Sequence, residues 1–412
     1  MHKNPLLLIL VAAGVLLSTL LAQGMGWLPA QNSNIATEVS RSPTPAAKGA
    51  FGEAFEGAPA SPQPWNPPTW DVTVHSRDRH TWYQLEPMAA VHGHDCGPHP
   101  ATHTISSYEE AVFQCRNHIM TAIQAEGYGA IYLTPNQLVD LSQGEAVIRF
   151  DLSTLRTSNR DWVDLWISPY ADHLQLPLDE GVDLQGRPRH AIHIRMAQAG
   201  ARNELTFFRA AVVRDFAETI LPANVTPYEQ MLTPDAARRD TFELRLSRTH
   251  VRFGMPQYNL WWVDTAMPEL AWQQGVVQFG HHSYNPTKCE GGCTANTWHW
   301  DNVSITPAVP FTMIKGQARV ANAEQPVVQL AAPAPAGSRL RFAAWGQGLE
   351  VSVDGGQSWQ AARVQPAEFQ FWHHFMSYWM EIPAGTTTVQ FRNTNPDSRD
   401  WLVRDLSVWA MP

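Results

Sequence analysis

The chain has 412 residues and a formal net charge of −9. This acidic balance argues against a nucleic-acid partner, because proteins that bind nucleic acids usually present a basic patch. Charged residues make up only 16% of the chain, whereas tryptophan is frequent, with 17 residues. Indole rings fill hydrophobic cores, and their flat faces also suit stacking on other rings. Composition therefore leaves a structural and a ligand-binding explanation of the tryptophans open.

Residues 1–24 have the pattern of a secretory signal peptide. A basic start at Lys3 precedes an apolar run from Leu6 to Leu21, and small residues follow it. The run is shorter than the roughly 20 residues that span a bilayer. We therefore expect export to the cell surface or the extracellular space, with an uncleaved N-terminal membrane anchor as the alternative. Residues 25–49 are rich in Ala, Ser, Pro and Thr, which predicts a flexible linker.

Period-two alternation of apolar and polar residues dominates the rest of the chain. It is clearest in residues 146–152, 190–196, 242–246 and 251–253, and such alternation is typical of half-buried strands. Residues 108–125 fit either a helix or a strand. Many short strands with turn-rich connections predict an all-β sandwich or jelly roll.

A composition change near residues 307–310 divides the body into two regions. The first, residues 50–308, is predicted to be a large β-sandwich, and the second, residues 309–412, has the size of a small one. Both regions close on a similar segment, at residues 298–305 and 401–408, in which Asp, an aliphatic residue and Ser recur. This recurrence favours two sandwiches, and the smaller one is a candidate carbohydrate-binding module.

The order of several segments in the first region resembles the concanavalin A-like lectin/glucanase superfamily, and family 16 glucanase domains in particular. The segments that carry this resemblance are residues 51–57, 129–135, 144–152, 162–169, 240–253 and 300–303. The resemblance implies a concanavalin A-like jelly roll. Residues 352–359 in the second region resemble the Asp-box hairpin of sialidases, which implies a structural turn capped by Asp354.

The catalytic motif of the resembled hydrolases, Glu-x-Asp-x-x-Glu on one strand, occurs nowhere in the chain. The nearest acidic clusters are residues 161–164 and 179–183. In the first cluster the two acids would point to opposite faces of a strand. We interpret both clusters as solvated turn acids, with an unfamiliar acid/base pair as the alternative. No catalytic residue is therefore assigned.

The four cysteines favour disulfides, because their number is even and the protein is expected to be exported. The two glycines between Cys289 and Cys293 permit a tight loop, so we expect these two to pair. The remaining pair would then be Cys96 with Cys115.

Two metal sites are conceivable. His92, His94 and His99 could form a zinc or copper site, because imidazoles two apart on an extended strand share a face. The alternative is a loop with surface histidines. The resemblance to family 16 also implies a structural calcium ion between the first and last strands, with Glu53 and Asp301 as candidate ligands.

Our first hypothesis for the function is a non-catalytic, lectin-like protein that binds a polysaccharide or glycan. The candidate ligand-binding residues are Trp162, Trp166, Tyr170, Trp261, Trp262, His282 and Tyr284. The second hypothesis is a glycoside hydrolase or polysaccharide lyase with displaced catalytic residues, which a carboxylate pair or a Tyr/His pair in the cleft would favour. The third is a structural or adhesive surface protein. Adjacent side chains on a strand face opposite ways, so at least one of the neighbouring Trp261 and Trp262 is predicted to be exposed and to contact ligand.

Overall fold

A computed structural model describes most of the chain after residue 48. The described residues are 49–57, 63–76, 112–115, 117–123, 128–153, 160–173, 188–198, 207–224, 239–284, 296–316, 319–321, 326–345, 348–361, 376–394 and 402–411. Residues 43–412 belong to one compact unit. Within the described residues, no helix is both long enough and apolar enough to cross a membrane.

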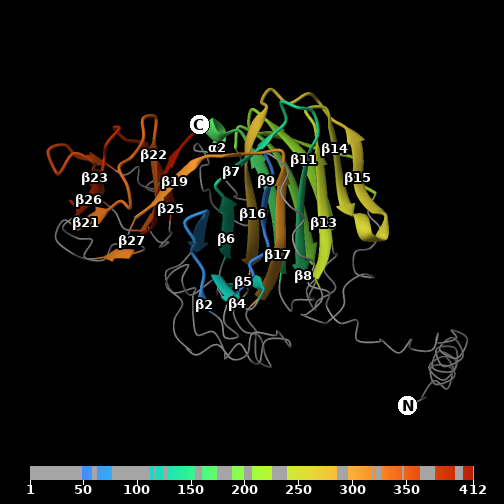
Figure 1. The fold of residues 1–412 in the computed structure, drawn as a ribbon, viewed down its shortest axis with the longest axis horizontal. Coiled ribbons are helices and arrows are strands. Elements are labelled where there is room, and N and C mark those ends of the chain that lie inside the picture. The colour runs from blue at the N-terminus through green and yellow to red at the C-terminus, as the bar shows by residue number, and fades with distance from the viewer. Residues whose placement is uncertain are drawn as a thin grey trace, which may run out of the picture. The chain divides into compact units, whose positions relative to one another are not determined.

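Two antiparallel sheets form the larger sandwich (Figure 1). Sheet A has the strand order β15-β14-β13-β8-β17-β5-β4-β2, with β1 paired to β17. Its strands are β1 (Phe51–Glu53), β2 (Gln63–Pro64), β4 (Val112–Cys115), β5 (His118–Ile123), β8 (Ala146–Ser153), β13 (Arg239–Leu246), β14 (His250–Met255), β15 (Leu260–Ala266) and β17 (Asn296–Thr306).

Sheet B has the strand order β12-β11-β10-β9-β16-β6-β3, with β7 paired to β16 and β18 paired to β7. Its strands are β3 (Trp70–Ser76), β6 (Tyr128–Pro135), β7 (Gln137–Asp140), β9 (Arg160–Ser168), β10 (His190–Gln198), β11 (Phe207–Arg214), β12 (Ala217–Ile220), β16 (Gln274–Tyr284) and β18 (Ala308–Pro310). A short helix, α2 (Tyr170–His173), follows β9, and a 3-10 turn, η4 (Pro256–Tyr258), precedes β15.

The core of the larger sandwich lies between the inner faces of these two sheets. Phe150 and Phe242 of sheet A stack with ring centroids 5.5 Å apart, and Phe279 of sheet B meets Phe150 edge-on at 5.4 Å. All three rings are at most 1% exposed. Burial of this large apolar area supplies the main driving force for folding.

The last strand of the larger sandwich returns beside the first. Strand β1 pairs antiparallel with β17, and Gly52 lies opposite Ser304. The strands predicted over residues 242–246 and 251–253 are confirmed as β13 and β14, which pair as an antiparallel hairpin. The helical interpretation of residues 108–125 is wrong, because their described residues form the hairpin of β4 and β5.

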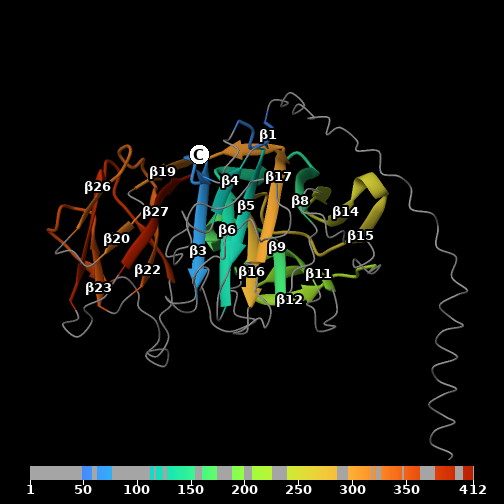
Figure 2. The ribbon, with the colours of Figure 1, turned by 90° about the horizontal axis from the view of Figure 1, so that it is seen from below.

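The smaller sandwich also consists of two sheets (Figure 2). Sheet C has the order β19-β27-β22-β25 with β20 paired to β27, and sheet D has the order β21-β26-β23-β24. The strands are β19 (Thr312–Lys315), β20 (Arg319–Ala321), β21 (Val327–Gln329), β22 (Arg339–Trp345), β23 (Leu349–Ser352), β24 (Gln360–Ala361), β25 (Met376–Glu381), β26 (Thr388–Asn393) and β27 (Leu402–Ala410). The all-β fold class predicted from the sequence is therefore confirmed.

The predicted hairpin cap lies in the smaller sandwich. Asp354 Oδ1 accepts hydrogen bonds from the backbone N–H groups of Gln357 and Ser358, at 3.0 and 2.9 Å. The two glycines that follow it have φ angles of 74° and 86°, which residues with side chains rarely adopt. A hydrogen bond from the Ser358 hydroxyl, together with those from the Ser358 backbone, the Ser352 hydroxyl and the Gln357 backbone, holds the pKa of the Asp354 carboxyl well below its usual range.

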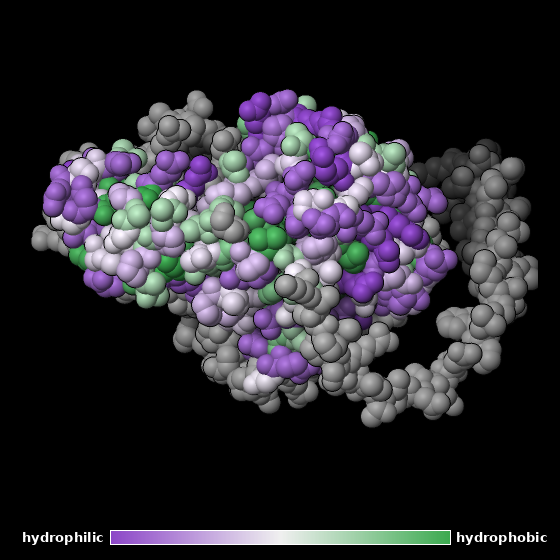
Figure 3. Space-filling model, turned by 45° about the horizontal axis from the view of Figure 1, so that its top comes forward, coloured by the Kyte–Doolittle hydropathy of each residue, from purple (hydrophilic) through white to green (hydrophobic). Residues whose placement is uncertain are grey.

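The two sandwiches contact each other through an apolar cluster. Trp409 of β27 is fully buried and packs against Phe311, with ring centroids 5.1 Å apart. The hydroxyl of Tyr170 donates a hydrogen bond to the backbone oxygen of Trp409 at 3.3 Å. Burial raises the pKa of Tyr170 to about 12, against the opposing charge of Arg339. Elsewhere, the face of the molecule in Figure 3 shows hydrophobic residues in small patches among hydrophilic ones.

Candidate functional site

The two faces of sheet B carry different chemistry. The inner face is apolar and belongs to the core, through Val163, Leu165, Ile167, Ile192, Ile194, Val277 and Phe279. Every second residue of the same strands points to the outer face, and seven of these residues are aromatic or polar: Trp162, Asp164, Trp166, His193, Arg195, Gln278 and His282. Each of the seven is at most 9% exposed. We call this outer face the polar face of sheet B.

Strand register places these side chains in rows that run across the sheet. One row consists of Tyr132, Gly280, Asp164, Arg195 and Arg209. The next row consists of Asp71, Thr134, Gln278, Trp166 and His193. In the row on the other side, His282 lies opposite Trp162. The site thus draws on six neighbouring strands, from β3 to β11.

Asp164 is the centre of the hydrogen-bond network on the polar face. Its Oδ1 contacts Nε2 of His282 at 3.0 Å, and its Oδ2 contacts Nε2 of His193 at 3.3 Å. The indole N–H of Trp166 donates to the same Oδ2 at 3.1 Å. Three donors around one carboxylate are the arrangement that keeps a buried carboxylate ionised.

The pKa values of this network follow from burial and charge. Burial on its own would raise the pKa of Asp164, but the charge of His282 and the hydrogen bonds from both histidines outweigh it and hold the pKa well below its usual range. Burial lowers the pKa of His282, although the Asp164 carboxylate opposes this effect. At neutral pH the pair is therefore an aspartate anion and a neutral histidine that donates its Nε2–H.

Aromatic rings cover this network. The Trp166 ring stacks on His193 with centroids 3.6 Å apart, and the Trp162 ring stacks on His282 at 5.0 Å. The guanidinium carbon of Arg195 lies 5.5 Å from the Trp162 ring centroid. Trp162 and Trp166 are 8% and 5% exposed, so a ligand that stacks on either indole requires the polar face to open.

Two further groups border the network. His193 Nδ1 lies 3.5 Å from Oε1 of Glu218, which Arg209 also contacts. On the opposite side, the half-buried ring of Tyr132 meets His282 edge-on, with centroids 5.2 Å apart. The polar face therefore offers acceptors, donors and rings within one connected network. Among the described residues, no cluster of three or more His, Cys, Asp or Glu side chains is arranged to hold a metal ion.

The structure brings together three of the predicted ligand-binding residues, Trp162, Trp166 and His282. Tyr170 lies away from them, because it packs against the smaller sandwich. Its ring stacks with that of Trp409, with ring centroids 6.4 Å apart. Tyr284 lies at the end of β16, and its side chain is outside the described part of the structure.

Two other predicted ligand-binding residues lie on sheet A. Trp262 is 2% exposed and belongs to the core between the sheets, so its predicted place on the ligand face is wrong. Trp261 points away from that core and lies beneath Arg252, whose guanidinium carbon is 3.8 Å from the ring centroid. Neither residue belongs to the polar face of sheet B.

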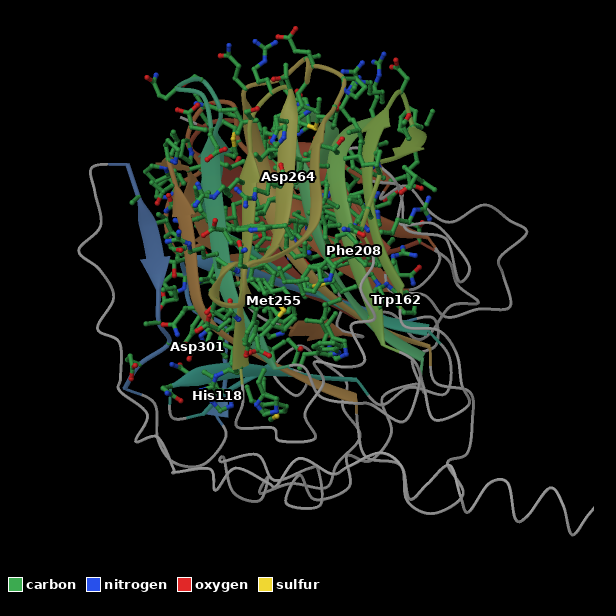
Figure 4. All side chains as sticks on the ribbon, turned by 90° about the vertical axis from the view of Figure 1, so that its right-hand side faces the viewer. His118, Trp162, Phe208, Met255, Asp264 and Asp301 are labelled. Carbon is green, nitrogen blue, oxygen red and sulfur yellow. The ribbon has the colours of Figure 1, made fainter. Side chains whose placement is uncertain are left out.

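The candidate calcium ligands lie at the other side of the larger sandwich. Figure 4 shows Asp301 and Trp162 on opposite sides of it. Asp301 lies near Arg239, with Oδ2 and Nε 3.6 Å apart, and Glu53 Oε1 accepts a hydrogen bond from the Phe55 backbone at 3.3 Å. An arginine beside Asp301 does not fit a calcium ligand set, so the described contacts give calcium no support. The calcium site stays a prediction.

Several other predicted residues lie outside the described part of the chain. These are residues 1–48, the zinc or copper candidates His92, His94 and His99, the acidic residues 179–183, and Cys96, Cys289 and Cys293. Cys115 ends β4, but its side chain is not described. The leader, both disulfides and the zinc or copper site therefore stay predictions.

The interpretation of Asp164 as a solvated turn acid is wrong, because it lies within β9 and is 2% exposed. His193 and Arg195 were recognised only as part of an alternating strand. Such residues can be found in a sequence where polar and aromatic side chains recur at every second position of a strand, as in Trp162-x-Asp164-x-Trp166. That pattern becomes meaningful only once the neighbouring strands are known.

Comparison with known proteins yields distant structural similarity. No protein-family model matches the chain, and no curated protein matches it. LamAcat from Zobellia galactanivorans aligns with a TM-score of 0.40 and 11% identity, over 62% of this chain and 96% of that one. An immunostimulatory antigen and pseudo beta-1,3-glucanase of Mycobacterium tuberculosis aligns with a TM-score of 0.34 and 12% identity, over 62% and 97%.

A carbohydrate-binding module from Bacillus subtilis aligns with a TM-score of 0.27 and 10% identity, over 45% of this chain and 85% of that one. Because each of these TM-scores lies below 0.5, the all-β architecture rests on the coordinates of this chain.

Proposed function

We propose that this protein is an exported, lectin-like protein that binds a polysaccharide on the polar face of sheet B. The observation that carries the proposal is the gathering of Trp162, Trp166 and the Asp164 network on one face. Buried ionisable groups cost stability unless they are paired, and perturbed pKa values cluster at functional sites. Indole rings suit stacking on sugar rings, and the polar side chains suit bonding to hydroxyls.

Affinity electrophoresis of the full chain against a panel of polysaccharides tests this proposal. Trp166→Ala should weaken binding roughly 5- to 150-fold, because stacking of a ring on tryptophan contributes about 1–3 kcal/mol in the analogous case of nucleic-acid bases. Trp261→Ala is the matched control, because Trp261 lies on sheet A under Arg252, and it should bind like the wild type. Equal affinities of both variants for a polysaccharide that the wild type binds would contradict the proposal.

A polysaccharide lyase is the second candidate, because Tyr132 and His282 form a Tyr/His pair on the polar face. Such a pair can supply the acid and base of an elimination reaction. His282 is fully buried beneath Trp162, so an elimination reaction, like stacking on either indole, requires the polar face to open. Release of reducing ends from the same polysaccharides distinguishes the two, since a lyase or a hydrolase creates them and a lectin does not.

A structural or adhesive role is the remaining alternative. It predicts association with the cell surface without affinity for any polysaccharide of the panel. Export itself is tested by N-terminal sequencing of the secreted protein, which should begin near residue 25 if the leader is removed.

A further inference from the structure

A buried arginine of the smaller sandwich reaches the edge of sheet B. Arg341 of β22 donates a hydrogen bond from Nη2 to Oδ1 of Asp71 on β3, at 2.6 Å. The side chains of Arg341 and Asp71 are only 3% and 5% exposed. Arg341 is therefore a buried cation whose charge is balanced by one carboxylate of the other sandwich.

The other two nitrogens of this guanidinium, Nε and Nη1, are buried and have no hydrogen-bond partner among the residues that the structure describes. In its own sheet, Arg341 lies opposite Ser407, whose Oγ already accepts a hydrogen bond from Trp409 at 3.0 Å. Arginine stays charged at any relevant pH, so donors left unmatched in this way cost free energy. Proteins generally place a water molecule or a ligand at such donors.

The Asp71 partner connects Arg341 to the polar face. Asp71 opens the row that continues through Thr134, Gln278 and Trp166. Neighbouring strands are about 4.8 Å apart, so the three steps from β3 to β9 cover roughly 14 Å. Once the polar face opens, an oligosaccharide that lies across the strands spans the distance from Trp166 to the junction between the sandwiches.

We propose that the glycan-binding face extends into this junction, where Nε and Nη1 of Arg341 donate hydrogen bonds to oxygen atoms of the sugar. Hydroxyl, ring and carboxylate oxygens can all accept such bonds. The inference rests on the proposed function and adds a binding residue from the smaller sandwich. The smaller sandwich is then a part of the binding site, and removing it would impair binding by the larger one.

Two single substitutions separate binding from stability. Arg341→Lys keeps a positive charge against Asp71 but removes the guanidinium donors, so affinity should fall at least tenfold with little change in melting temperature. Asp71→Asn keeps all three nitrogens of Arg341 but breaks the ion pair, so the melting temperature should fall while the affinity of the folded protein changes less than threefold. The double variant Asp71→Asn/Arg341→Gln retains a neutral amide pair and replaces Arg341→Lys if that variant does not fold.

These variants are measured on the full chain, beside Trp166→Ala, with a polysaccharide that the wild type binds. If Arg341→Lys and the double variant bind like the wild type while Trp166→Ala does not, the inference is wrong and the proposed function stands. If the wild type binds no polysaccharide, the proposed function fails and the inference fails with it. A crystal structure with saturating oligosaccharide in which only water contacts Nε and Nη1 would also overturn the inference.

Discussion

The carboxylate of Asp164 occupies the space that a side chain on Gly280 would need. A Cβ atom built on Gly280 would lie 2.0 Å from Asp164 Oδ1 and 3.0 Å from Nε2 of His282. Gly280 lies directly opposite Asp164 in the sheet. Because Gly280 has no side chain, the Asp164 carboxylate can lie over β16 and reach His282. The hydrogen-bond network therefore requires glycine at position 280.

The first prediction concerns Gly280→Ala. The added methyl group should displace the Asp164 carboxylate and destabilise the protein by about 1–3 kcal/mol, the usual range for overpacking. Urea unfolding measures this change, with the slope of the transition as a check on two-state behaviour. Polysaccharide affinity should fall as well, because the displaced carboxylate no longer orients Trp166.

Gly52→Ala is the matched control for this prediction. Gly52 also lies in a strand, and a Cβ atom built on it meets nothing within 4 Å. We expect a change of stability within about 0.5 kcal/mol. If Gly280→Ala behaves like this control, the Asp164 carboxylate is not fixed by its surroundings.

The second prediction is a loss of stability in acid that originates at His282. Its pKa is lowered from the ordinary value of 6.5 by burial, so the unfolded chain binds a proton more readily than the folded one. Stability from this group is complete above pH 6.5 and is lost as pH falls through the folded pKa, with a slope of at most about 1.4 kcal/mol per pH unit. The pKa of Asp164 is also lowered, from 3.8, so the stability that this carboxylate contributes is lost only in stronger acid.

Urea unfolding between pH 7.5 and 4.5 measures this dependence. In His282→Gln, which cannot titrate, the fall of unfolding free energy below pH 6.5 should be smaller than in the wild type. Identical pH dependences of the two proteins would show that His282 does not titrate differently in the folded state.

The third prediction concerns Asp301, which should make the protein less stable as the pH rises, the opposite of the effect of His282. Burial raises its pKa to about 7, against the charge of Arg239, with a contribution from Asp151. The folded protein therefore holds this proton more tightly than the unfolded chain does. The resulting stability is fully present below pH 3.8, the ordinary pKa, and is lost as the pH rises through about 7. Between pH 5 and pH 8, the wild type should therefore lose stability relative to Asp301→Asn.

The same titration tests the calcium hypothesis. A bound calcium ion would favour the ionised carboxylate, so calcium should lower the pKa of Asp301 and raise the melting temperature. Titrations with calcium and with EDTA that coincide would count against the ion. In that case the pH dependence of Asp301 reflects burial alone.

The sequence predicts where individual strands lie better than it predicts which strands pair with each other. Alternation predicted residues 146–152 and 190–196, which form β8 and β10, because one buried face leaves a period of two in the sequence. It could not predict the Asp164 network. Its donors Trp166, His193 and His282 come from three strands that are adjacent only in the folded sheet.

The burial of Asp164 was missed for a second reason: an expectation based on one residue leaves out its hydrogen-bond partners. Asp164 was expected to be solvated, because an isolated carboxylate is costly to bury. The structure buries it because three donors meet it. For Trp262, by contrast, the general tendency of large rings to fill cores holds, because its ring lies in the core between the sheets.

The last prediction separates Trp261 from Trp262. The Trp262 ring packs against Phe208, Phe242 and Phe253, with centroid distances of 5.6 to 5.9 Å. Trp262→Ala should leave a large cavity and destabilise the protein by about 3–5 kcal/mol.

Trp261→Ala should cost much less, about 0.5–1 kcal/mol, because it mainly removes the stacking of Arg252 on a partly exposed ring. Urea unfolding gives both free energies, and affinity electrophoresis of the folded variants gives their binding. Because neither side chain lies on the polar face of sheet B, the folded fraction of each variant should bind polysaccharide like the wild type. A selective loss of affinity in Trp261→Ala would instead place a ligand contact on sheet A, as the sequence first suggested.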